Sequence, residues 1–142
     1  MSPPIVADTG GLLRGLASTR DGQPSFPEYE KILTSASLVI VPGLVLAEVD
    51  YFLRENRVAM RKNTSCRYPP TLSAPLNSTP DSGSSIWGLV DGTVVAVAER
   101  RHIYRVLTTD RRDFAAIRVG PRLTRALELL PWRPNPSIPS LH

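Results

Sequence analysis

The feature that most constrains this fold is a series of short apolar segments, rich in β-branched residues, that alternate with helical patterns. The segments "PIVAD" (4–8), "SLVIV" (37–41) and "IYRVLTT" (103–109) read as strands, because they are short, apolar and bounded by polar or turn-forming residues. Strands that are separated by helices favour a parallel sheet covered by helices on both faces. We therefore expect an α/β protein.

Helical patterns fill the segments between these strands. Pro42 fits the first turn of a helix, since its missing N–H would be unpaired there in any case. Apolar residues follow it at helical spacing; they are Leu46, Val49, Phe52 and Leu53. The expected helices span 10–18, 27–36, 43–56 and 90–101, and "IRVG" (117–120) is a candidate fourth strand.

Length and composition limit the kind of protein. A chain of 142 residues with 42% hydrophobic residues can bury a core as one domain. It has no apolar run of roughly 18 residues, and its N-terminus lacks the basic and apolar regions of a signal peptide, so neither a membrane span nor secretion is expected. The one cysteine, Cys66, excludes an internal disulfide framework and a cysteine-based zinc site. We therefore expect a soluble cytoplasmic protein.

The charge of the chain is modestly positive. Its formal net charge is +4, and arginine accounts for 15 of the 17 basic residues. Arginine can bind phosphate through two parallel hydrogen bonds, so the composition admits a nucleic-acid partner. A genome-wide bias toward arginine would explain the same composition, so charge alone does not decide between the two.

Four acidic residues occupy positions that this fold could bring together. Asp8 and Asp110 lie at the carboxyl ends of two expected strands, where open parallel sheets bind ligands. Glu48 interrupts the apolar helical stretch "LVLAEV", and Asp91 begins a helix. Each has a plainer explanation: Asp91 as a helix cap, Glu48 on a solvated face, and the other two as polar strand ends. It is less probable that all four plain explanations hold at once than that any one of them does, and this favours a shared site.

Several carboxylates at one site require a counter-charge. Two of them about 5 Å apart repel each other by roughly 3 kcal/mol at an effective dielectric constant of about 20. Oxygen-only ligands, without cysteine or paired histidine, select Mg²⁺ or Mn²⁺. Such ions beside a basic surface fit hydrolysis of a phosphodiester.

The same residues resemble the PIN-domain ribonucleases, in particular the VapC-like toxins of bacterial type II toxin–antitoxin modules. The matching stretches, in order, are "IVADTGGLL" (5–13), "VIVPGLVLAEVDYFL" (39–53), "GLVDGTVVAVAERR" (88–101) and "VLTTDRRDF" (106–114). The resemblance covers most of residues 4–131 and rests on the order and spacing of the four acids. It implies a PIN-like three-layer α/β/α domain with a central parallel sheet of four to five strands.

The resemblance implies a role for each acidic residue. The catalytic residues, which would also bind Mg²⁺ or Mn²⁺, would be Asp8, Glu48, Asp91 and Asp110. In the family mechanism the metal binds the scissile phosphate and lowers the pKa of a water molecule, and Asp8 and Asp91 hold the metal. Glu48 and Asp110 position metal or water for in-line attack. Asp113 is a neighbouring acid that could assist or substitute as a metal ligand.

Candidate substrate-binding residues lie beside these acids. Arg111 and Arg112 could hold flanking phosphates, although screening of the acids or simple exposure to solvent is an equal alternative. Thr9 is a further candidate for substrate binding. Thr9, Thr93 and Thr109 are also candidate hydroxyls behind the metal ligands.

The resemblance also implies partners. Relatives cut structured RNA such as tRNA or ribosomal RNA, pair as homodimers and bind an antitoxin whose C-terminal segment lies over the active site. The expected partners are therefore an RNA substrate, a cognate antitoxin and a second copy of this chain, with no membrane.

One segment departs from the family pattern. Residues 63–85 hold thirteen Pro, Ser or Thr among 23 positions, where relatives have an apolar helix, and four prolines forbid a continuous helix. Three explanations stay open: a disordered linker, an adapted loop, or a shifted reading frame that is restored near Trp87. We expect a PIN-like domain at 1–131 that contains this segment, and a proline-rich tail at 132–142.

Other classes of protein fit less well. A catalytically impaired PIN-like domain, which binds RNA or an antitoxin without cleaving, is the main alternative because the middle segment is altered. The D-T-G sequence at 8–10 is the signature of dimeric aspartic proteases, but those are all-β chains. A phosphotransferase of the haloacid-dehalogenase type would need an acid at the position of Gly10.

Overall fold

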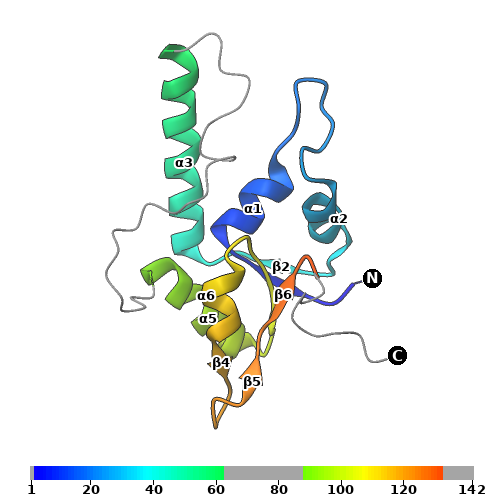
Figure 1. The fold of residues 1–142 in the computed structure, drawn as a ribbon, viewed down its shortest axis with the longest axis vertical. Helices are drawn as coiled ribbons and strands as arrows, with labels where there is room; N and C mark the ends of the chain where they lie inside the picture. The colour runs from blue at the N-terminus through cyan, green and yellow to red at the C-terminus, as the bar shows by residue number, and fades with distance from the viewer. Residues whose placement is uncertain (1, 63–87, 133–142) are drawn as a thin grey trace.

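The computed structural model describes residues 2–62 and 88–132 of the chain (Figure 1). The expectations for segment 63–85 and for the tail beyond Trp132 lie outside these residues. The described elements, in chain order, are β1 (Ile5–Ala7), α1 (Thr9–Leu16), α2 (Pro27–Ser35), β2 (Val39–Ile40), α3 (Gly43–Lys62), α5 (Leu89–Arg101), β3 (Arg105–Leu107), α6 (Arg111–Ala116), β4 (Arg118–Val119), β5 (Arg125–Ala126) and β6 (Glu128–Leu130).

A parallel sheet of four strands forms the centre of the fold, in the order β2-β1-β3-β6. Val106 of β3 pairs with Val6 of β1 on one side and with Leu129 of β6 on the other. Together with the five helices of the described ranges, this sheet confirms the expected α/β class.

The candidate strand at 117–120 forms, but it does not join the parallel sheet. It is β4, which pairs antiparallel with β5 in a separate two-stranded sheet. A turn reverses the chain between them, closed by a 2.9 Å hydrogen bond from the Leu123 amide to the Gly120 carbonyl. The fourth strand of the parallel sheet is β6, which the sequence did not predict because "ELL" is too short to separate a strand from a helix by periodicity.

Helices cover both faces of the parallel sheet. On one face, Leu107 of β3 belongs to a core with Tyr29 of α2. On the opposite face, the preceding residue Val106 belongs to a core with Val94 of α5 and Phe114 of α6. Successive strand residues point to opposite faces, so both must be apolar when both faces are covered. This is why these strands read as unbroken apolar runs in the sequence.

Two glycines let α1 begin directly against the end of β3. A Cβ atom on Gly11 would lie 2.2 Å from the carbonyl oxygen of Leu107, and one on Gly10 would lie 2.1 Å from Oγ1 of Thr109. Side chains cannot approach so closely, so this packing requires glycine. The contact holds Asp8, which precedes α1, beside the carboxyl end of β3.

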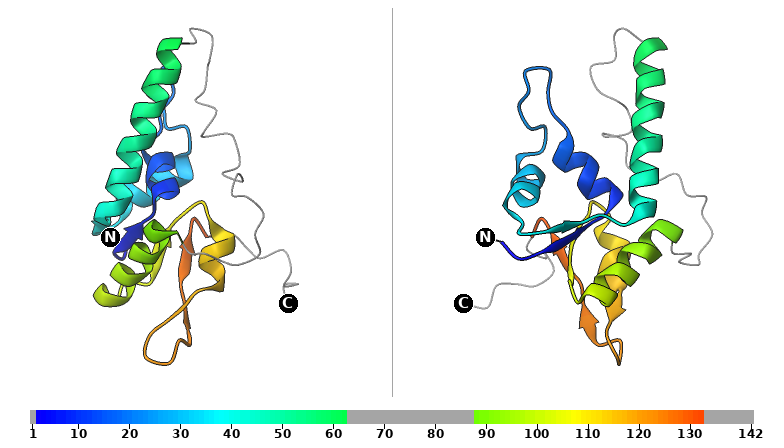
Figure 2. Two further views of the ribbon diagram at one scale, coloured as in Figure 1. Left: turned by 90° about the vertical axis from the view of Figure 1, so that its left-hand side faces the viewer. Right: turned by 180° about the vertical axis from the view of Figure 1, so that it is seen from behind.

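The long helix α3 packs on the core near its start. Val45 and Val49 are buried there, whereas Leu46 and Leu53 of the expected apolar set are 53% and 51% exposed. Figure 2 shows α3 extending beyond the sheet on the side where α1 lies. Across residues 2–62 and 88–132, no helix combines the length and the apolar character that crossing a membrane requires.

Candidate functional site

The site begins where β1 and β3 end side by side. The strands pair Ala7 with Leu107, so the next residues, Asp8 and Thr108, lie next to each other. The Asp8 amide donates a 3.0 Å hydrogen bond to the Leu107 carbonyl. The Thr108 hydroxyl donates a 2.8 Å hydrogen bond to Oδ2 of Asp8, and both residues are buried. Sheet register, which sequence reasoning could not supply, thus sets the position of the Asp8 carboxylate.

Thr108 also connects Asp8 to Asp110. Its hydroxyl oxygen accepts a 3.0 Å hydrogen bond from the Asp110 amide. Asp110 then begins α6 as its N-cap, since Oδ1 accepts a 3.2 Å hydrogen bond from the Asp113 amide. One oxygen of Asp110 is therefore engaged in the capping interaction that is typical of this position, and its side chain also lines the cavity described below.

Glu48 enters the same site from α3. It is half-buried, and its Oε2 accepts a hydrogen bond from the Thr9 hydroxyl of α1. This bond ties the two helices together beside Asp8. The interpretation of Glu48 as a residue on a solvated face does not fit this position.

Asp91 completes the set from the first turn of α5. The N-cap residue of α5 is Gly88, three positions earlier, and it makes no side-chain capping bond. Asp91 is half-buried and lines the same cavity as the other three acids. The simple interpretation of Asp91 as a helix cap is therefore not what the structure has.

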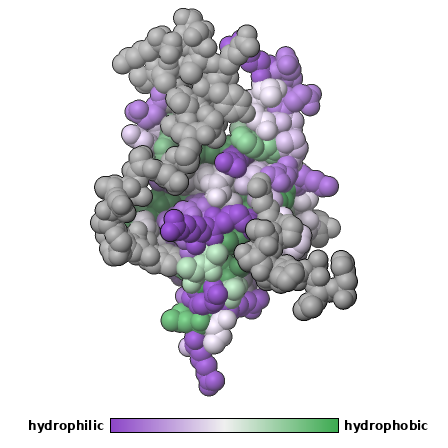
Figure 3. All heavy atoms as spheres, in the orientation of Figure 1, coloured by the Kyte–Doolittle hydropathy of each residue, from purple (hydrophilic) through white to green (hydrophobic). Residues whose placement is uncertain are grey.

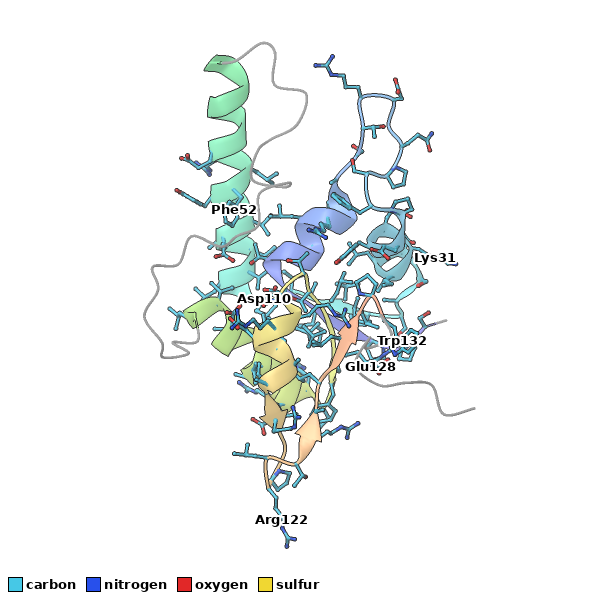
Figure 4. The ribbon with its side chains drawn as sticks, viewed as in Figure 1. Lys31, Phe52, Asp110, Arg122, Glu128 and Trp132 are labelled. Carbon is cyan, nitrogen blue, oxygen red and sulfur yellow. The ribbon has the colours of Figure 1, made fainter. Side chains whose placement is uncertain are left out.

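A cavity of about 300 Å³ brings all four acids together. Its acidic half joins the ends of β1 and β3 to α3 and α5, and its other half is apolar and lies between α1 and α3. Figure 4 shows Asp110 where these elements meet, with Phe52 further along α3. The lining residues are Asp8, Thr9, Gly10, Leu13, Leu16, Ala17, Glu48, Val49, Phe52, Leu53, Asp91, Thr109 and Asp110. None of them is basic.

The surroundings of Asp8 and Asp91 raise the pKa values of these two carboxyl groups. Burial raises the pKa of Asp8; the hydrogen bonds from Thr108 and from the Thr9 amide oppose this, and the charges of Glu48 and Asp110 add to it. Burial raises the pKa of Asp91 to about 6, with further contributions from Asp8, Asp110, Glu48 and Asp113. Acids that are destabilised in their charged form in this way are typical of sites that bind a cation or a proton.

The carboxylates of the cavity could supply some, but not all, of the ligands of a small divalent cation. In the portion of the chain that the structure describes, no three Asp, Glu, His or Cys side chains are arranged so that they could hold a metal ion together. Mg²⁺ does not need such a cage, because it keeps several waters and commonly takes one or two carboxylates together with phosphate oxygens. Asp8 and Asp91 both line the cavity, and the charge of Asp8 adds to the raised pKa of Asp91, so this pair could supply them.

The additional metal ligand expected at Asp113 and the phosphate-binding residues expected at Arg111 and Arg112 differ in their exposure and contacts. Asp113 is exposed and does not line the cavity, although its charge reaches Asp91. Arg111 is half-buried, and its Nη1 donates a 2.6 Å hydrogen bond to the Pro131 carbonyl, which holds this side chain against the end of β6. Arg112 is exposed.

The three threonines expected behind the acids also differ. Thr9 donates to Glu48 and is buried, so its hydroxyl positions an acid of the site. Thr109 lines the cavity. Thr93 donates to the Val90 carbonyl of its own helix and does not line the cavity.

Sequence reasoning missed two features of the site. Thr108 was overlooked, although it is the first polar residue after the apolar run of β3 and so occupies the position that matches Asp8 after β1. The apolar half of the cavity was also not expected; Leu13, Leu16 and Phe52 are its principal side chains. The spacing of Leu13 and Leu16 on α1 gave a weak signal for a shared helix face.

Fold and site together define an α/β domain with a carboxylate-lined cavity at the carboxyl edge of its parallel sheet. Comparisons of this chain with models of protein families, with curated proteins and with solved structures each find no match.

Proposed function

We propose that this protein is a metal-dependent endoribonuclease of the PIN-domain type that hydrolyses phosphodiester bonds in structured RNA with the help of Mg²⁺ or Mn²⁺. One observation carries the proposal: acids from four separate segments line one cavity at the end of a parallel sheet. Burial and the charges of neighbouring acids raise the pKa values of Asp8 and Asp91, and a bound cation would relieve both effects. The order of the four acids matches the family named above.

Each acid has a distinct task in this proposal. Asp8 and Asp91 are the residues that would hold the cation, because burial and neighbouring acids destabilise the charged form of their carboxyl groups. Glu48 and Asp110 would orient the attacking water, and the Thr9 hydroxyl fixes the rotamer of Glu48. When bound, the cation would neutralise charge on the scissile phosphate and make a water molecule more acidic.

The proposed partners follow from the same family. A cognate antitoxin and a second copy of this chain remain proposals, and exposed apolar side chains near the cavity support the presence of a protein partner. Leu16 of α1 is 66% exposed and Leu53 of α3 is 51% exposed, and both line the cavity. Apolar surface of this kind commonly marks a contact site.

A second function is favoured by a different observation. Because no three acids of the described residues are arranged around a common ion position, a PIN-like domain that binds RNA or an antitoxin without cleaving is the alternative. The two proposals differ in one property, namely metal-dependent hydrolysis.

Cleavage of a mixture of tRNA and ribosomal RNA tests the proposal. The purified full chain is incubated with Mg²⁺, with Mn²⁺ or with EDTA, alongside Asp8→Asn and the matched control Asp21→Asn, which changes an exposed acid of the loop between α1 and α2. Discrete products that require metal, persist in the control and vanish in Asp8→Asn are expected. A folded protein that gives no products with either metal would establish the non-cleaving alternative.

A further inference from the structure

Positive charge gathers at the end of the molecule away from the cavity. Five exposed arginines lie on the last turn of α5 and on the β4–β5 hairpin, and we call this set the arginine-rich end; it comprises Arg100, Arg101, Arg118, Arg122 and Arg125. No basic residue lines the cavity itself, and the arginine-rich end is a different set from Arg111 and Arg112, which follow Asp110 in α6.

Specific contacts hold the hairpin against α5 and against Tyr104, which follows this helix. The Gly120 amide donates a 2.9 Å hydrogen bond to Oε1 of Glu99 in the last turn of α5. The guanidinium of Arg125 lies 3.8 Å from the ring centroid of Tyr104, within the range of a cation–π interaction. These contacts fix the hairpin as part of the domain surface.

The turn of the hairpin presents Arg122 at its tip. Pro121 and Arg122 are the two central residues of the turn that the Leu123-to-Gly120 hydrogen bond closes. Proline at the first central position fixes φ and so reduces the freedom of the loop. Figure 4 shows Arg122 projecting from the extreme end of the molecule, and Figure 3 shows hydrophilic side chains at that end.

The arginines of this end are free to bind an external anion. Two ion pairs that the structure shows among residues 2–55 and 88–132, Arg54 with Asp50 and Arg105 with Glu128, do not include a member of the arginine-rich end. Arg118 uses Nη1 for the carbonyls of Ala115 and Ile117, which leaves its other guanidinium nitrogens available. Nearby acidic side chains are already engaged, since Glu99 accepts from Gly120 and Glu128 accepts from Arg105.

The distance between this end and the acids can be estimated along α5. Asp91 lies in the first turn of the helix and Arg101 is its last residue, which places the two about 15 Å apart at 1.5 Å per residue. A ligand that reaches both sites must therefore span at least about 15 Å, which corresponds to roughly four nucleotides of one strand of a duplex at 3.4 Å each.

We propose that the arginine-rich end is a binding site for the phosphate backbone of RNA, separate from the cavity and used to hold a structured substrate while a distant part of it reaches the acids. This inference rests on the proposed ribonuclease function for the identity of the ligand. All five cations are arginine, whose planar guanidinium binds phosphate through paired hydrogen bonds. Their spread over a helix end and a rigid hairpin matches a rigid, extended anion better than a small one.

Binding in the absence of cleavage tests the proposal. Fluorescence anisotropy of a labelled tRNA is measured in EDTA over a range of salt concentrations, with the wild type, the double variant Arg101→Gln/Arg122→Gln and the control Arg20→Gln/Lys31→Gln. Both double variants remove two positive charges, but Figure 4 shows Lys31 on α2, far from Arg122. All four residues are exposed, and unfolding curves verify that each variant is folded.

The expected result is a loss of affinity at the arginine-rich end alone. Arg101→Gln/Arg122→Gln should weaken tRNA binding about tenfold and lower the magnitude of the slope of log K against log salt by roughly 2, at about one per phosphate contact. The control should stay within about twofold of wild type.

Two results would overturn the inference. Equal losses in both double variants would mean that binding follows net charge and not this surface. Unchanged tRNA binding, together with lost binding to vesicles of anionic lipid, would assign the surface to a membrane. Because the assay contains EDTA, it is independent of catalysis: absence of cleavage would reject the proposed enzyme and leave this binding result standing.

Discussion

The hydroxyl of Thr108 donates a 2.8 Å hydrogen bond to Oδ2 of Asp8, although the two residues lie 100 positions apart in the chain. The bond exists because β1 and β3 are adjacent and in register, so the first residue after each strand meets its neighbour. Since the same hydroxyl accepts from the Asp110 amide, one threonine positions two of the four acids. Disturbing it should affect both stability and site geometry.

Replacing Thr108 by valine should destabilise the fold. Valine has nearly the same shape, but it leaves the buried Asp8 carboxyl without a donor and the Asp110 amide without an acceptor. A loss of about 2 kcal/mol in the free energy of unfolding is expected, because unsatisfied polar groups cost about 1–3 kcal/mol each and partial relaxation recovers some of it. Urea denaturation measures the change.

Thr108→Ser is the matched control for this variant. It keeps the hydroxyl and removes one methyl group, so it should lose about 1 kcal/mol or less. A serine variant as unstable as the valine variant would show that packing, and not hydrogen bonding, is the role of Thr108.

Two glycine-to-alanine substitutions should have opposite effects on stability. At Gly11 a Cβ would lie 2.2 Å from the Leu107 carbonyl oxygen, so α1 must move away from β3. A loss of about 2 kcal/mol or more is expected, because overpacking of a core costs about 1–3 kcal/mol. At Gly92, inside α5, a Cβ has no neighbour within 4 Å, and alanine should stabilise the helix by about 1 kcal/mol.

Thermal unfolding of the two glycine variants measures both changes. A stabilised Gly11→Ala protein would contradict the close packing of α1 on β3, on which the position of Asp8 depends.

The stability of the metal-free protein should fall as the pH rises from 4 to 7. Burial raises the pKa of Asp91 from 3.8 to about 6, so the folded state binds this proton more tightly than the unfolded state. The contribution is complete below the unfolded pKa and is lost as the pH passes through about 6. The raised pKa of Asp8 acts in the same direction.

Asp91→Asn should remove part of this pH dependence. Asparagine stays neutral, so the variant should be more stable than wild type at pH 7, by about 1 kcal/mol after allowance for the screening of a half-exposed group. Denaturant unfolding at several pH values in EDTA tests this, with Asp21→Asn as an exposed control. An Asp91→Asn profile parallel to that of wild type would show that Asp91 is not destabilised by its surroundings.

The acids could be predicted from the sequence because local rules place them. Asp8 and Asp110 each follow a short apolar run, and parallel strands expose their carboxyl ends at one edge. Glu48 was conspicuous as a charge in an apolar helix. Strand order, which decides whether Asp8 and Asp110 meet, was not predicted from the sequence; the structure places β1 beside β3.

The features that were missed depend on tertiary contacts. The partner of Arg111 is the Pro131 carbonyl, which reaches it only because β6 runs beside β3. The assignment of β4 to a separate sheet depends on the turn after it, and the exposure of Leu46 depends on the direction in which α3 leaves the core. Local sequence does not encode any of these.

Divalent cations should stabilise this protein in a manner that depends on the acids and on pH. At pH 7, a ligand at about 100 times its dissociation constant adds roughly 2.7 kcal/mol to the free energy of unfolding, so Mn²⁺ should raise the unfolding temperature of the wild type. Asp8→Asn should abolish most of the shift, while Asp21→Asn keeps it. Near pH 4.5 the shift should disappear in the wild type as well, since the raised pKa values of Asp8 and Asp91 mean that protons then compete with the metal.

Differential scanning fluorimetry with and without Mn²⁺ measures this shift in unfolding temperature without reference to catalysis. A Mn²⁺ shift that persists in Asp8→Asn, or that is unchanged at pH 4.5, would place the cation elsewhere on the molecule and remove the principal support for a metal-dependent nuclease.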